Sequence, residues 1–111
     1  MQVKDILTIL DLKVFGRSRG LDREITGGYT SDLLSDVMGH AENGKIWITL
    51  QTHKNVLAIA SLKDLAAVIL IKGLEPDADM LAQAEEEGIP VLGTNDPAFE
   101  TTGKLYNLLS H

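Results

Sequence analysis

The stretch of sequence that decides the fold opens with Lys45-Ile46-Trp47-Ile48-Thr49-Leu50 and ends at Gly73. Its β-branched and aromatic start predicts a strand. Residues 56–62 are apolar and rich in alanine, and they predict a short helix. Residues 66–71, AAVILI, form an apolar run without polar alternation. Such a run is typical of a strand in a sheet covered on both faces, so the three segments predict a βαβ unit with parallel strands.

On the amino-terminal side of this unit, apolar residues at helical spacing predict a first helix over residues 3–10. Short strands are predicted at residues 12–15 and 24–26, and Gly27-Gly28 is expected to turn the chain. The next helix should be capped by Thr30 or Ser31, carry Asp32 in its first turn and end near Gly39. Its expected buried stripe is Leu33, Leu34, Val37 and Met38.

On the carboxyl-terminal side, Pro76-Asp77 should start a helix with Leu81 and Ala84 facing inward and residues 85–87 facing outward. Gly88 and then Pro90 are typical of a helix end. Residues 90–92 predict a last short strand. An Asp96 cap with Pro97 at the first position should then open the final helix, whose expected apolar side is Phe99, Leu105, Leu108 and Leu109. The expected fold class is α/β, with a mainly parallel sheet, in one domain over residues 1–111.

Composition excludes several classes of protein. A 44% hydrophobic content fits a globular chain, and the longest apolar run is too short to span a bilayer. The net charge of −6 argues against a nucleic-acid partner, which requires a basic surface. The lack of cysteine fits a reducing compartment, and acidic residues interrupt any signal peptide at the start, so we expect a cytoplasmic protein that does not act at a membrane.

Polar residues follow the predicted strands, and this pattern predicts a ligand site. In open α/β sheets, ligands bind beyond the carboxyl ends of the parallel strands, beside helix amino termini. Hydroxyls, amides, glycines, one lysine and one histidine are typical of anion or nucleotide binding, and they favour binding over bond breaking. The expected ligand-binding residues are Thr26, Gly27, Gly28, Thr30, Ser31, Gln51, Thr52, His53, Asn55, Lys72, Thr94 and Asn95.

Each candidate also has a structural interpretation. The glycine pair is a simple turn in most such sequences, and His53 is more often a cap than a base. Tyr29 and Trp47 are more typical of a core or an interface than of a stacking platform. Arg17 and Arg19 offer a weaker phosphate site in a loop. Asp32 and Asp36, four residues apart, are more typical of solvated helix charges than of a cation site.

Catalytic and metal motifs are absent from the sequence. It contains no G-x-x-x-x-G-K-[ST] loop and no G-x-G-x-x-G fingerprint. His40, His53 and His111 lack the spacing of a zinc helix. We therefore expect no catalytic residue, no metal site and no cofactor.

Four segments resemble the signature of the DRTGG domain: residues 24–38, EITGGYTSDLLSDVM; residues 47–60, WITLQTHKNVLAIA; residues 84–92; and the closing segment from Ala98 to Tyr106. The similarity covers nearly the whole chain, from Val3 to Leu109. The name-giving pentad falls on residues 24–28, where its Asp and Arg are replaced by Glu24 and Ile25.

The resemblance implies a three-layer α/β/α fold similar to the amino-terminal domains of HPr kinase/phosphorylase and of the MurF ligases. It also implies an accessory, dimer-forming regulatory module, as found beside CBS domains in regulated pyrophosphatases. It does not imply a kinase, since the kinase domain is missing.

These observations lead to three hypotheses. The first is a non-catalytic, homodimeric regulatory module that senses a phosphate-bearing metabolite or adenine nucleotide. The second is an adaptor in a redox or hydrogenase-type assembly. Its acidic residues 75–87 would dock the partner protein. The third is a small phosphotransferase or hydrolase with His53 as base and Lys72 on the phosphate. Apolar residues near Trp47 and a short edge strand favour a two-fold dimer.

Overall fold

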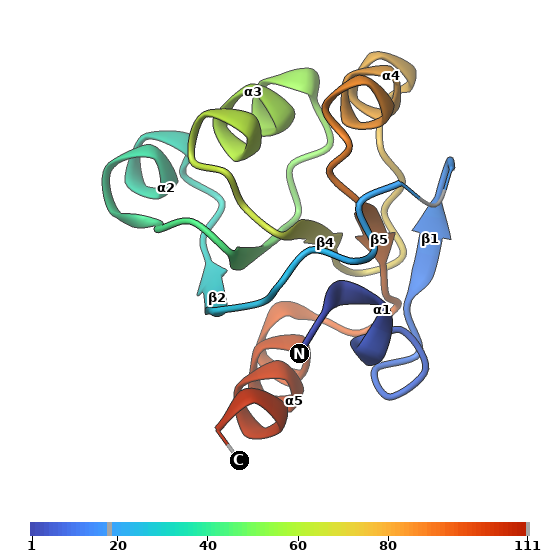
Figure 1. Cartoon of the computed structure of the whole chain (residues 1–111), viewed down its shortest axis with the longest axis vertical. Coiled ribbons are helices and arrows are strands. Elements are labelled where there is room, and N and C mark those ends of the chain that lie inside the picture. Colours follow the sequence, from blue (N-terminus) through green and yellow to red (C-terminus); the bar gives the residue numbers. More distant parts are fainter. Residues whose placement is uncertain (18, 111) are drawn as a thin grey trace.

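The computed structural model describes residues 1–17 and 19–110 and shows a five-stranded sheet between two layers of helices (Figure 1). This confirms the predicted three-layer α/β/α class. In chain order the elements are α1 (Val3–Ile6), β1 (Lys13–Phe15), β2 (Gly27–Thr30), α2 (Leu34–His40), β3 (Lys45–Thr49), α3 (Lys54–Leu62), β4 (Ala67–Leu70), α4 (Ala78–Glu87), β5 (Val91–Gly93) and α5 (Ala98–Leu109).

The strand order is β1-β5-β4-β3-β2. Strands β2 to β5 are parallel, and β1 is antiparallel to β5 at the far edge. Each successive parallel strand is added on the same side of the previous one. Because such crossovers are right-handed, α2, α3 and α4 all lie on one face of the sheet, and α1 and α5 lie on the other (Figure 1). The parallel part of the sheet therefore has no point at which the strand order reverses.

Two apolar clusters hold the layers together. Trp47 and Val68 belong to the cluster under α2, α3 and α4, whereas Ile46, Ile48 and Leu105 belong to the cluster with α1 and α5. Neighbouring residues of β3 thus serve opposite faces, and all of β4 is buried. The predicted βαβ unit is confirmed, with Trp47 opposite Val68 in the register.

The second predicted strand was misplaced. Residues 24–26 cross the amino-terminal end of the sheet, where Ile25 N–H donates to the Met1 carbonyl, and the strand itself is Gly27–Thr30. Gly27 and Gly28 are therefore strand residues and not a turn. The lack of a side chain at Gly28 lets α5 approach closely, since a Cβ here would lie 3.1 Å from Leu105 Cδ2.

Helix α2 begins later than predicted, with Leu33 as its N-cap, and it runs through Gly39 to His40. The Asp32 carboxylate lies outside the helix, because it accepts hydrogen bonds from the loop that follows β3. Only Val37 of the predicted stripe is buried, and Leu33 and Met38 are exposed.

Other predictions were wrong at the ends of the chain. The first helix is a single turn, and Leu12 N–H instead bonds to the Leu7 carbonyl. The N-cap of α5 is Pro97, and Phe99 is 86% exposed. Trp47 is fully buried and donates from Nε1 to the Ser31 carbonyl at 2.8 Å, so it belongs to the core and cannot support a dimer interface.

Candidate functional site

Most of the predicted site residues lie at or just beyond the carboxyl edge of the sheet. Thr30 is the last residue of β2, Gln51 follows β3, Lys72 follows β4, and Thr94 follows β5 directly. The structure thus brings one set of polar residues to this edge. Its members are Thr30, Ser31, Gln51, Thr52, His53, Asn55, Lys72, Thr94 and Asn95.

Thr26, Gly27 and Gly28 do not belong to this set, contrary to the prediction. Gly27 pairs with Lys45, the first residue of β3, so these residues lie at the amino edge. Thr26 N–H donates to the Gly44 carbonyl at 2.9 Å, and its hydroxyl donates to the Asn43 carbonyl at 2.8 Å. The prediction failed because it took the glycine pair for a turn after a strand.

Backbone hydrogen bonds tie the loops of the carboxyl edge to one another. Lys72 N–H donates to the Asp96 carbonyl at 3.0 Å, and Gly73 N–H donates to the Thr94 carbonyl at 2.8 Å. Asp77 N–H donates to the Thr52 carbonyl at 2.9 Å. These three amides are therefore already paired and do not donate to a ligand.

Asp32 joins the end of β2 to the end of β3. Its Oδ1 accepts from the Thr49 hydroxyl and from Leu50 N–H, both at 2.9 Å. Gln51 Nε2 donates to the Asp32 carbonyl at 3.1 Å. Gln51 is therefore engaged in fixing this loop.

His53 is the N-cap residue of α3, as its structural interpretation suggested, without a side-chain cap bond. Its Nδ1 lies 2.7 Å from Asp77 Oδ2, and the side chains are 69% and 46% exposed. This carboxylate orients one ring nitrogen, which a general base would require. The pair is nevertheless open to water, and no nucleophile bonds to His53 among the described residues.

A hollow of about 340 Å³ lies at the β4–β5 side of the carboxyl edge. Thr94 and Asn95 line it together with Gly73, and Lys13 lies on the wall made by β1, with its Nζ 5.0 Å from the centre of the Phe15 ring. Further wall residues are Asp11, Leu12, Leu74, Glu75 and Gly93. The hollow therefore combines cationic, anionic, amide and hydroxyl groups.

Sequence reasoning missed the contribution of β1 to this hollow. Lys13 and Asp11 lie there because β1 pairs with β5, a strand almost eighty residues away in the chain. Neither residue carries a local signal of that pairing. Phe15 packs over Gly93, where a Cβ would lie 2.6 Å from Phe15 Cε2, and both residues line the hollow.

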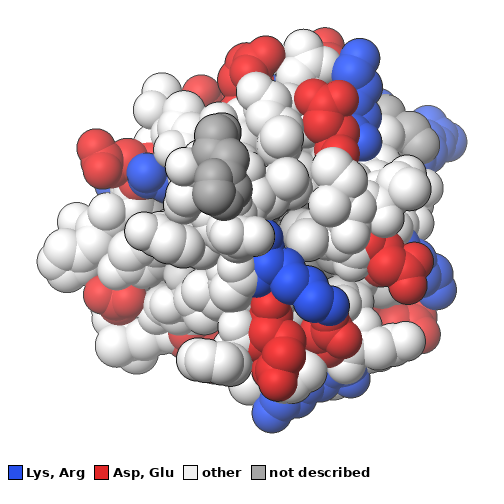
Figure 2. Space-filling view, turned by 90° about the horizontal axis from the view of Figure 1, so that it is seen from below, with Lys and Arg blue, Asp and Glu red and all other residues white. Residues whose placement is uncertain are grey.

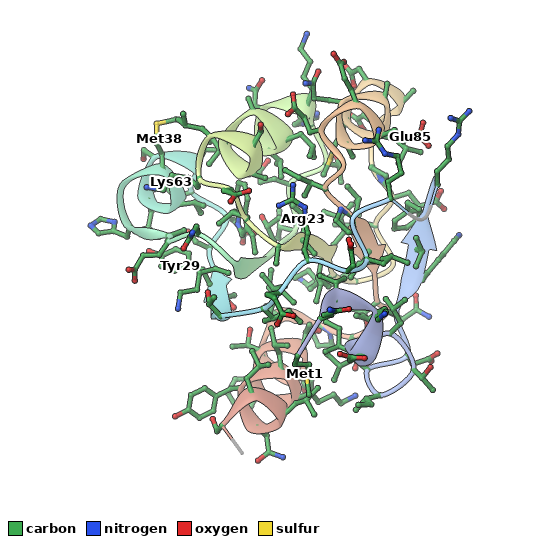
Figure 3. The ribbon with its side chains drawn as sticks, in the orientation of Figure 1. Met1, Arg23, Tyr29, Met38, Lys63 and Glu85 are labelled. Carbon is green, nitrogen blue, oxygen red and sulfur yellow. The ribbon has the colours of Figure 1, made fainter. Side chains whose placement is uncertain are left out.

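The loop arginines and the acidic helix contact each other. Arg17 N–H donates to Glu85 Oε1 at 3.1 Å, and Arg19 donates to the Glu85 carbonyl. The phosphate site expected in this loop therefore already faces the carboxylate of Glu85, which is labelled in Figure 3. Glu87 accepts from Ser61 and Gln83. Of residues 85–87, predicted to face outward, only Glu86 is fully exposed, and the other two are half-buried.

Tyr29 and Asp36 form a polar pair on the α2 side of β2. The Tyr29 hydroxyl donates to Asp36 Oδ2 at 2.9 Å, and this bond lowers the pKa of Asp36 and raises the pKa of Tyr29. His40 Nδ1 lies 3.2 Å from Asp36 Oδ1. The predicted interpretation of Asp36 as a solvated helix charge is therefore incomplete, because it binds the strand to the helix.

Within residues 1–17 and 19–110, no three histidine or acidic residues gather in a group that could hold a metal ion. His111 lies outside the described residues. None of the helices in the described part of the chain combines the length and the apolar character needed to cross a membrane.

A family model described as the DRTGG domain matches residues 5–108. Among solved structures, the chain is similar to the CBS and DRTGG domains of the regulatory region of Clostridium perfringens pyrophosphatase, complexed with the activator diadenosine tetraphosphate. The TM-score is 0.69 at 14% identity, over 95% of this chain and 46% of that chain. The chain thus spans less than half the length of this relative, and no curated protein matches its sequence.

Proposed function

The chain belongs to the DRTGG domain family, and from this premise we propose that it is a non-catalytic regulatory module. In this proposal it works as a homodimer and senses a phosphate-bearing metabolite, with adenine nucleotides as the first ligand class. The sensing site is the hollow between β1, β5 and the loop after β4.

The single observation that carries this proposal is the mixture of groups around the hollow. Lys13 supplies a cation for a phosphate group, while Asp11 and Glu75 are acceptors for hydroxyl or amino donors. Thr94 and Asn95 add neutral groups of both kinds. A nucleotide carries an anion together with hydroxyl and amino donors, and a volume of about 340 Å³ is within the usual range of small-molecule sites.

The relative supports the choice of ligand class. The Clostridium perfringens regulatory region was solved with diadenosine tetraphosphate, which contains both adenine bases and phosphates. At 14% identity the likeness concerns the fold, so the ligand of this chain is a proposal to be tested.

A catalytic role has less support. The pair of His53 and Asp77 is the best candidate for a general base, but water reaches both side chains, and the pair does not line the hollow. A small phosphotransferase or hydrolase would need a shielded reaction centre in addition.

The adaptor hypothesis also loses part of its surface. Glu85 and Glu87 are engaged within the molecule, and Asp77 is paired with His53, which leaves Glu75, Asp79 and Glu86 as the other exposed acids of this region. The adaptor role is therefore the second proposal. In it, these residues dock a partner protein in a redox or hydrogenase-type assembly.

The test is isothermal titration of AMP, ADP, ATP and diadenosine tetraphosphate into the full chain, with adenosine and inorganic phosphate as separate probes. We expect Lys13→Gln to raise the Kd of the best nucleotide about tenfold, since it removes a charge-assisted contact. Lys4→Gln, an exposed lysine on α1, is the matched control and should leave the Kd unchanged. The absence of binding by all six compounds would eliminate nucleotide sensing.

A further inference from the structure

Strand β2 is an open edge of the sheet. It pairs only with β3 within the described part of the chain, and it is the end strand opposite β1. Ser31 N–H, just beyond the strand, donates to the Ile48 carbonyl of β3. Because successive residues of a strand direct their amides to opposite sides, Gly28 and Thr30 present theirs to the free side. Such an edge can accept another strand.

An apolar groove runs along this edge between β2 and α5. It has a volume of about 420 Å³, and Ile48, Leu105 and Leu109 contribute to its lining together with β2 itself. Tyr106 stands at its border and is 74% exposed. Figure 2, which views the molecule from the side of α5, shows a largely uncharged surface that is interrupted near the centre of the view by a Lys or Arg side chain beside acidic side chains. The groove thus offers apolar contact area beside unpaired backbone groups.

The two ends of the β2 edge carry opposite charges. At the amino end, Lys45 Nζ lies 2.7 Å from the position that a Cβ of Gly27 would occupy, so the ammonium group reaches across the glycine. No carboxylate of the described residues forms an ion pair with it. At the carboxyl end, Asp32 is exposed, and its described partners are the neutral donors Thr49 and Leu50 N–H.

We propose that the β2 edge and its groove bind a second copy of this chain, with the two β2 strands antiparallel across a two-fold axis. This rests on the dimeric state in the proposed function and assigns its interface. The pairing joins two five-stranded sheets into one and buries Tyr106 of each protomer. It also places Lys45 of each protomer beside the Asp32 end of its partner.

A second copy fits this surface better than an unrelated strand does, because reversal of the edge matches its charges. A parallel neighbour would place lysine beside lysine and aspartate beside aspartate. The two-fold axis repeats every favourable contact twice, which compensates for the shortness of the four-residue strand.

The experiment is sedimentation velocity on the full chain over a range of concentrations, comparing the wild type with Tyr106→Lys and Lys45→Glu. We expect the wild type to dimerise, Tyr106→Lys to raise the dimer Kd at least about tenfold, and Lys45→Glu to raise it several-fold at low salt. Leu62→Lys is the matched control, because Leu62 is 69% exposed on α3 in the opposite layer. It should dimerise like the wild type.

Hydrogen exchange gives a second readout that does not depend on a variant. The amides of Gly28 and Thr30 should exchange more slowly as the concentration of the protein rises, since they gain partners in the dimer. Unchanged exchange at these amides in a dimeric sample would overturn the interface.

The outcomes separate the two proposals. If the wild type dimerises and neither variant weakens the dimer, the interface is elsewhere, and the proposed function stands. If the wild type stays monomeric at all concentrations, the dimeric part of the proposed function fails together with its interface. Nucleotide binding by Tyr106→Lys should equal that of the wild type in either case, because the sensing hollow does not include Tyr106.

Discussion

The hollow at the carboxyl edge and the groove beside β2 differ in their lining. Charged and polar groups line the hollow, whereas apolar side chains dominate the groove. The walls of the hollow are the ends of β1 and β5 together with loops held by hydrogen bonds, such as that of Gly73 N–H to the Thr94 carbonyl. The floor of the groove is core, because Leu105 packs against Gly28 and is almost fully buried. A change in the wall of the hollow therefore removes single hydrogen bonds, whereas a change at the groove floor removes buried apolar contacts.

This difference teaches where sequence-based site prediction goes wrong. Polar residues after strands were all assigned to a ligand, yet Gln51 and Thr52 serve to bind loops together. The glycine pair was expected to turn the chain and to line the ligand site, yet Gly28 lies in a strand and allows α5 to approach the sheet. A change at the groove floor should consequently cost more stability than a change in the hollow wall.

The largest effect is expected at the groove floor. Leu105→Ala removes a buried side chain that packs between α5 and the sheet, and it should lower the free energy of unfolding by about 2–5 kcal/mol. Urea denaturation followed by circular dichroism measures this. Leu108→Ala, a half-buried neighbour on α5, should cost clearly less, and equal losses at the two positions would contradict a floor made of core.

The next effect is expected where the hollow meets the sheet. In Gly93→Ala the new methyl group would lie 2.6 Å from Phe15 Cε2, so the Phe15 ring must shift. Overpacking of this kind costs about 1–3 kcal/mol. The same change at Gly28 meets Leu105 at 3.1 Å and should cost less. Thermal unfolding of both variants tests the order, and a larger loss for Gly28→Ala would reverse it.

A smaller effect is expected in the wall of the hollow. The Thr94 hydroxyl accepts a hydrogen bond from Asp96 N–H at 3.1 Å, and Thr94→Val removes this acceptor at nearly constant shape. The loss should be about 0.5–1.5 kcal/mol by chemical denaturation. Thr94→Ser retains the acceptor and is the control. A loss as large as that of Leu105→Ala would show that the wall is as rigid as the groove floor.

The smallest effect is expected in the pH dependence of stability, through the hydrogen bond between Tyr29 of β2 and Asp36 of α2. The pKa of Asp36 is lowered from 3.8, mainly by the Tyr29 hydroxyl, so its contribution to stability is present above that pH and is lost as the pH falls through the lowered value. The pKa of Tyr29 is raised from 10.0, so its contribution is present below that pH and is lost as the pH rises.

Tyr29→Phe should therefore lower the urea midpoint slightly near neutral pH, and the difference from the wild type should shrink at both extremes of pH. Tyr106→Phe, whose hydroxyl has no described hydrogen bond, is the control. A constant difference at all pH values would show that the hydroxyl–carboxylate bond is not its cause.

The parts of the fold that local sequence specifies were predicted well. The apolar segment of β4, the helix stop at Gly88, and the strand with Trp47 each carry their signal within a few residues, and all three were confirmed. Phe99 was predicted to be buried because it is apolar, but its position on α5 turns it to solvent. Hydrophobicity alone does not show which face of a helix meets the sheet.

The candidate site was harder to predict because its walls come from distant parts of the chain. Thr94 and Asn95 follow a strand and were found, whereas Lys13 reaches the hollow only through the pairing of β1 with β5. The placement of Gly27-Gly28 depended on the position of Leu105. Neither long-range contact leaves a trace in the local pattern of residues.

The antiparallel pairing of β1 with β5 has a consequence for synthesis of the protein on the ribosome. Residues 13–15 are synthesised first, whereas their partners at residues 91–93 are synthesised only after β2, β3 and β4. Before β5 is made, β2, β3 and β4 can pair with one another in order, but β1 has no strand to pair with. Strand β1 can therefore pair only after the other four strands have been synthesised, so the sheet is completed by a contact between the two most distant strands of the chain.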